Sequence, residues 1–178
     1  MAIFKNRFPT KQELYYFLLA CVFPIHVWSL INVMREIPAW VLRLSIAEML
    51  GVIAYAQLFA LLDTLVVFLP LVLVSAVLPA SLLRKRFVAV GTAVVFITSG
   101  WLIYLHLNNW VFEQRDTAVF AIWGVTYLVA MIGVYLLIQR SEKVAAGISN
   151  FVQRLSVLSI LYLIVDIISL IIVVVRIL

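Results

Sequence analysis

Asp166 is the residue whose surroundings most strongly suggest chemistry, because it interrupts the apolar run LYLIVDIISLIIVVV. If that run crosses a bilayer, an ionised carboxylate near its middle costs several kcal/mol, and such residues usually face protein and serve a function. At about 100° per residue, one face of the run collects the polar side chains, while the other faces carry Leu, Ile and Val. This polar intramembrane stripe consists of Ser159, Tyr162, Asp166 and Ser169.

Two roles fit the polar intramembrane stripe. One is a proton or cation pathway, and the other is a hydrogen bond across the bundle that holds two helices in register. A second predicted helix, 87–109, offers a matching face of small and polar residues, which lets another helix approach closely. That face consists of Gly91, Thr98, Ser99, His106 and Asn109, and we expect it to pack against the stripe. In the predicted helix 117–138, Thr126, Ala130 and Gly133 at helical spacing indicate packing rather than chemistry.

His26 and His106 are the two histidines of the chain. Because neutral imidazole is a common axial ligand, a pair from two membrane helices is a candidate cofactor-binding site for haem. Two ligands are few for a metal ion, so no metal site is predicted. The alternative is that both histidines are hydrogen-bonded or interfacial, and on balance we expect no cofactor.

Asp63 lies between two apolar runs in LFALLDTLVVFLPLVLV, which covers Leu58 to Val74. We expect it to be the N-cap of a helix, where its carboxylate would accept from the amide of Leu65 or Val66. The functional alternative is an ion-coordinating or proton-carrying acid, although the sequence identifies no partner for it.

Composition assigns the chain to a class. Of its 178 residues, 66% are hydrophobic and 12% are charged, and the mean hydropathy is +1.20. Soluble proteins carry about 25% charged residues, so this is predicted to be an integral membrane protein forming one domain over 1–178. The net charge is +5, and most Lys and Arg residues lie in short segments between apolar runs. This distribution is typical of the loops of a membrane protein and not of a nucleic-acid-binding surface. The single cysteine, Cys21, excludes an internal disulfide.

The expected fold is an all-α helical bundle. Thr10 to Glu13 reads as a capping box before a first span over 12–33, and later spans cover 87–109, 117–138 and 155–176. The run from Pro38 to Pro79 would reach more than about 60 Å as one helix, twice the bilayer core, so it must break. We place the break at Leu62-Asp63-Thr64, with 39–61 as an interfacial or re-entrant helix beside five transmembrane helices. The alternative is that 39–61 also crosses, which gives six.

Charge favours the five-span topology. Five spans place nine of the 13 Lys and Arg residues on one face of the membrane and four on the other, whereas six spans would divide them eight to five. The face with more cations is expected to be cytoplasmic. All five tryptophans would then lie in the outer half of the bilayer. We therefore predict a cytoplasmic N-terminus, in the plasma membrane.

The sequence contains no GxGxxG, P-loop, HExxH or GxSxG motif, so we expect no enzyme. The leading hypothesis is a non-catalytic membrane subunit that packs within a larger membrane complex or a homo-oligomer. The alternative is a small transporter or ion-conducting protein whose path is lined by Asp166, Tyr162, Ser159 and His106. A haem- or quinone-binding redox subunit is third.

Overall fold

The computed structural model describes residues 8–77, 86–108 and 117–178, and it is all-helical apart from short connections. Each of its five helices is long and apolar enough to cross a membrane, as the sequence predicts. They are α2 (Lys11–Val41), α3 (Ile46–Val77), α5 (Phe87–Leu107), α7 (Thr117–Arg140) and α8 (Glu142–Ile177).

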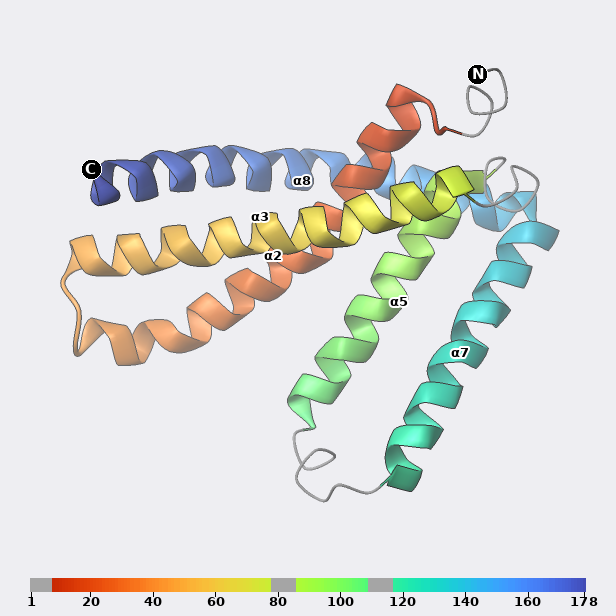
Figure 1. Cartoon of the computed structure of the whole chain (residues 1–178), viewed down its shortest axis with the longest axis horizontal. Helices are drawn as coiled ribbons and strands as arrows, with labels where there is room; N and C mark the ends of the chain where they lie inside the picture. Colours follow the sequence, from red (N-terminus) through yellow and green to blue (C-terminus); the bar gives the residue numbers. More distant parts are fainter. Residues whose placement is uncertain (1–7, 78–85, 109–116) are drawn as a thin grey trace.

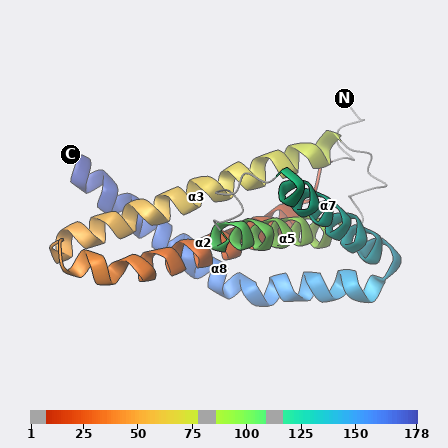
Figure 2. The same cartoon turned by 90° about the horizontal axis from the view of Figure 1, so that it is seen from below.

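The helices form two groups (Figures 1 and 2). Helix α3 contacts both α2 and α8, the C-terminal half of α8 runs beside α3, and α5 and α7 form an arm that diverges from these three helices. The start of α2, the end of α3, the start of α5, the end of α7 and the start of α8 gather at one end of the molecule (Figure 1). The α2–α3 turn lies far from that end, and so does the C-terminus of α8.

The connection between α2 and α3 lies earlier than we expected. Helix α2 continues through Pro38 to Val41, and α3 begins at Ile46 after a short turn. Ser45 caps α3, because its hydroxyl accepts from the Glu48 amide at 3.3 Å while the Glu48 carboxylate accepts from the Ser45 amide at 2.8 Å. The expectation of a separate interfacial helix over 39–61 is therefore wrong: residues 39–41 end α2 and residues 46–61 begin α3.

The predicted break at Leu62-Asp63-Thr64 is also wrong. Helix α3 runs through it without interruption for 32 residues, about 48 Å, and Thr64 donates its hydroxyl to the Ala60 carbonyl at 2.8 Å. Asp63 therefore lies near the middle of α3 and caps nothing. The run from Pro38 to Pro79 does contain a break, as its length requires, but the break is the turn at 42–45 between α2 and α3.

The capping box at the start of α2 is confirmed, with the Thr10 hydroxyl accepting from the Glu13 amide and the Glu13 carboxylate accepting from the Thr10 amide. The last helix is longer than the predicted span 155–176. It begins at Glu142, where Ser141 is the N-cap, and it continues for 36 residues.

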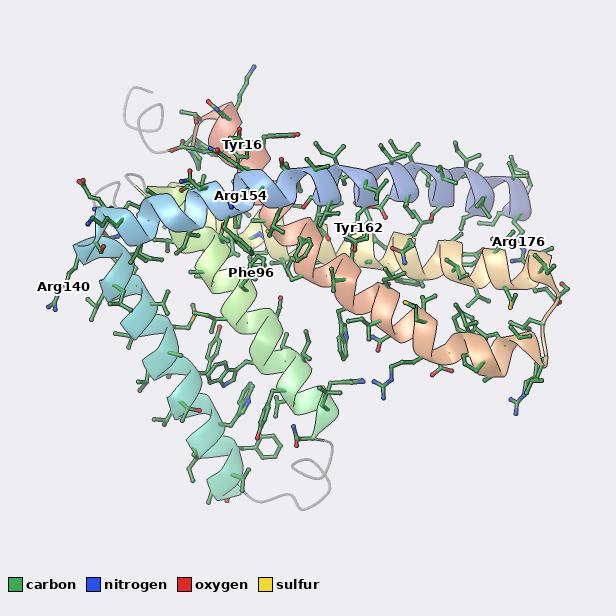
Figure 3. The ribbon with its side chains drawn as sticks, turned by 180° about the vertical axis from the view of Figure 1, so that it is seen from behind. Tyr16, Phe96, Arg140, Arg154, Tyr162 and Arg176 are labelled. Atoms are coloured by element: carbon green, nitrogen blue, oxygen red, sulfur yellow. The ribbon has the colours of Figure 1, made fainter. Side chains whose placement is uncertain are left out.

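Two apolar clusters join the helices. In the first, Phe17 and Cys21 of α2 pack with Phe87 and Val95 of α5. In the second, Ala89 and Val90 of α5 pack with Ile138 of α7, which joins the two helices of the arm, and Ala145 and Ile148 of α8 pack against this cluster. Phe96 extends the first contact, since its ring lies 6.3 Å from that of Phe23 in α2 and 5.6 Å from that of Phe151 in α8 (Figure 3).

Candidate functional site

Asp166 forms a buried pair with His26. The Nε2 atom of His26 lies 3.0 Å from each carboxylate oxygen of Asp166, and the two side chains are 0% and 2% exposed. Asp166 comes from the C-terminal half of α8 and His26 from the middle of α2, so the pair joins two helices through residues that are 140 positions apart in the chain. A contact of this kind holds two helices in one register.

The hydrogen bonds of His26 define where its protons lie. Its Nδ1 atom is 2.9 Å from the Val22 carbonyl, and a carbonyl only accepts, so Nδ1 carries a proton. A hydrogen bond at Nε2 then needs one further proton, either on Nε2, which donates to the carboxylate, or on the carboxyl group, which donates to Nε2. The pair carries no net charge in either arrangement. A neutral pair has a far smaller cost of burial than an unpaired charge.

Other residues of the polar intramembrane stripe join the same contact. Ser159 is fully buried and donates its hydroxyl to the Leu19 carbonyl of α2 at 2.9 Å. The Tyr162 ring projects from α8 and stacks on the His26 ring with centroids 5.4 Å apart (Figure 3). Ser169 is buried on the same face, one turn after Asp166.

The expectation that the small face of α5 would cover the polar intramembrane stripe is wrong, because α2 makes these contacts. Gly91 of α5 instead receives the Phe17 ring of α2. Thr98 forms a 2.9 Å hydrogen bond with Tyr127 of α7. Asn109 lies outside the described residues. The small and polar face of α5 is thus divided between α2 and α7.

The two histidines lie in different surroundings. His106 of α5 contacts Trp28 of α2 edge to face, with centroids 5.3 Å apart. Because Trp28 follows His26 by two residues, about 200° of rotation, the two histidines lie against opposite faces of α2. A haem or metal could reach both only through that helix. Both nitrogens of His26 are also occupied by Val22 and Asp166.

A groove of about 1010 Å³ runs between α2, α3 and α5, and it is the largest site that the sequence did not reveal. Each helix contributes one face at helical spacing: positions 25, 28, 32 and 36 of α2, positions 56, 60, 63, 67 and 70 of α3, and positions 95, 99, 102 and 106 of α5. His106 lies in this groove, whereas Ser159, Tyr162, Asp166 and Ser169 do not line it. The set of residues proposed for a transport path is therefore not gathered in one place.

Asp63 projects from the middle of α3 into the groove. It is exposed, and it makes no hydrogen bond or ion pair with any described residue. Most of the surrounding surface is apolar, and Trp28 and Tyr127 add aromatic faces. Two carboxylates in the middle parts of the described helices are thus in opposite conditions: Asp166 is paired with His26 and buried, whereas Asp63 is accessible and has no partner among the described residues.

Besides the groove, the sequence analysis missed the start of α3 and the pairing of His26 with Asp166, although a signal for the start of α3 was present. Ser45-Ile46-Ala47-Glu48 has the S-x-x-E pattern of a capping box and marks the start of α3. The pairing of His26 with Asp166 had no local signal, because it depends on which helix lies against the stripe.

In the residues that the structure describes, no cluster of three or more His, Cys, Asp or Glu side chains offers a metal site. Comparison of the chain with protein-family models, with curated proteins and with solved structures gives no match, so its function is argued from the site itself.

Proposed function

We propose that this chain is a non-catalytic integral membrane subunit that packs within a larger membrane complex. The observation that carries the proposal is the groove, because three helices direct faces of helical periodicity toward one space. In a bundle, a fourth helix occupies such a space.

The arm formed by α5 and α7 supports the same proposal. Of the 24 residues of α7, Ile138 is the one that is buried. The predicted packing row on this helix is not covered either, since Thr126 and Gly133 are exposed and a Cβ atom built on Gly133 would meet nothing within 4 Å. Small residues at helical spacing favour close helix contacts in membranes. A partner subunit would cover this face as well as the groove.

The paired state of Asp166 supports assembly over transport. Its carboxyl group is satisfied by His26 and covered by α2 and α8, so it serves to hold the subunit's own helices. This role leaves the surfaces of α3, α5 and α7 available for other proteins.

Purification from native membranes in a mild detergent, followed by mass spectrometry of the intact complex, tests the proposal. We expect a fixed stoichiometry with at least one other integral membrane protein. A homogeneous preparation of this chain alone, recovered in full yield from the same membranes, would contradict it.

We further propose that the N-terminus is cytoplasmic, in the plasma membrane. Five crossings put Lys11, Arg86, Arg140 and Lys143 at the end where α2 and α8 begin, and the α2–α3 turn at the other; Arg140 lies at the α7–α8 corner (Figure 3). Such a cation bias is typical of a cytoplasmic face.

Cysteine labelling checks this orientation. An impermeant maleimide added to intact cells should label Leu42→Cys, whose site is 85% exposed in the α2–α3 turn, and should label Lys143→Cys only after permeabilisation. The parent chain is the control, because its Cys21 is buried. Labelling of both sites from outside would refute the five-span topology, and the reverse pattern would refute the orientation.

A further inference from the structure

We propose that the groove binds a transmembrane helix of a partner protein that carries a Lys or Arg near its middle, and that this cation pairs with Asp63. The inference rests on the proposed role as a membrane subunit and names the chemistry of the partner. Three features of the groove support it: its length, its shape and its single central carboxylate.

The groove has the length of a membrane-spanning helix. On α3 its lining extends from Val52 to Leu71, about 28 Å along the helix axis, close to the thickness of a bilayer core of about 30 Å. A compact small molecule contacts only part of such a length, whereas an apolar helix of about 20 residues contacts all of it.

The shape of the groove also suits a helix. Ala56, Ala60 and Asp63 follow one another on the α3 wall at spacings of four and three residues, and Ala60 is buried where α2 lies against α3. Small residues at such spacings let two helix backbones approach closely. Leu102 of α5 and Pro70 of α3 also line the groove, and a partner's side chains would pack against them.

The charge of the groove determines what the partner must supply. Asp63 lies 17 residues after the start of α3 and 14 before its end, so in a bilayer it is far from both aqueous faces. Lipid acyl chains offer it neither a donor nor a cation, and an unpaired intramembrane charge is costly. Within this chain, α3 and α5 contain no Lys or Arg to pair with it, and Arg35 of α2 lies six residues before the α2–α3 turn, whereas Asp63 lies 17 residues beyond the start of α3. A Lys or Arg at the same depth on a partner helix satisfies the carboxylate and sets the depth of the partner.

A second copy of this chain is a less suitable partner. Its described cation nearest to a helix middle is Arg154, which lies on the half of α8 that begins at the cation-rich end of the molecule (Figure 3). That position does not match the central depth of Asp63.

The test uses a synthetic helix as the probe. The full-length protein is reconstituted in phosphatidylcholine vesicles with a 20-residue Leu/Ala peptide that has one central Lys and a terminal dansyl group. Binding is followed by energy transfer from the protein's tryptophans, two of which, Trp28 and Trp40, line the groove. A peptide with Leu in place of the Lys is the matched control.

We expect the Lys peptide to bind at least tenfold more tightly than the Leu peptide. Asp63→Asn should abolish this preference, Asp63→Glu should retain it, and Asp63→Lys should invert it toward a peptide with a central Asp. Equal binding of the Lys and Leu peptides to the parent protein would overturn the proposal. So would Asp63-dependent binding of tetraphenylphosphonium without any preference for the Lys peptide, because the groove would then be a site for free organic cations.

This experiment can fail independently of the proposed function. A complex recovered from native membranes whose yield is unchanged by Asp63→Asn, together with equal peptide binding, would retain the subunit role and refute the groove as the contact. A tenfold preference for the Lys peptide, with no complex recovered from native membranes, would support the groove as a helix-binding site and refute the proposed subunit role.

Discussion

Asp166→Leu should lower the thermal stability of the detergent-solubilised protein, and it should do so more than any other substitution of a carboxylate in the described helices. The change leaves Nε2 of the fully buried His26 without a partner, and an unsatisfied buried polar group costs about 1–3 kcal/mol. Asp166→Asn should cost less, because an amide can still donate a hydrogen bond to Nε2. Thermal or denaturant unfolding followed by circular dichroism gives the comparison.

The controls for this prediction lie in the same chain. Asp63→Leu makes the same substitution at a carboxylate that has no partner among the described residues, and its effect should stay within about 0.5 kcal/mol. The double variant His26→Phe/Asp166→Leu removes both polar groups, so it should recover most of the stability that Asp166→Leu loses. Equal destabilisation by Asp63→Leu and Asp166→Leu would show that the buried pair does not hold α2 against α8.

Gly91→Leu should also be strongly destabilising. A Cβ atom built on Gly91 would lie 2.7 Å from Cε2 of the Phe17 ring, which is closer than side chains can pack. The ring cannot move away easily, because Phe17 is fully buried with its centroid 5.1 Å from that of Phe87 and 5.5 Å from that of Phe68. Overpacking of this kind costs about 1–3 kcal/mol or more, and we expect a lower unfolding temperature with separation of α2 from α5.

Gly100→Leu is the matched control, since Gly100 lies on the same helix and a Cβ atom there would meet nothing within 4 Å. It should be neutral or slightly stabilising, because leucine is the better helix former. Adding Phe17→Leu to Gly91→Leu should relieve part of the cost, which a double-mutant cycle would reveal as coupling. If Gly91→Leu and Gly100→Leu shift the unfolding temperature alike, the close approach of α2 and α5 is not a determinant of stability.

The apolar runs of the sequence correctly indicated helices long enough to cross a membrane, although not where α3 and α8 begin, and the helical period identified the face of the last helix on which Asp166 lies. Both follow from local rules, since a run of about 20 apolar residues and a period of 3.6 can be read without neighbours. The capping box at Thr10 is equally local. The S-x-x-E pattern at Ser45 is local in the same way, and it marks the start of α3 after the α2–α3 turn.

The contacts of each polar face, by contrast, depend on which helices pack together. Leu, Ile and Val surfaces of different membrane helices are nearly equivalent to lipid, so hydrophobicity does not select the neighbour of a given helix. That selection comes from shape and hydrogen bonding: Phe17 fits against Gly91, and His26 reaches Asp166 across 140 residues of sequence. The same packing pairs Asp166 with His26 and leaves Asp63 accessible in the groove, although both carboxylates lie in similar apolar runs of the sequence.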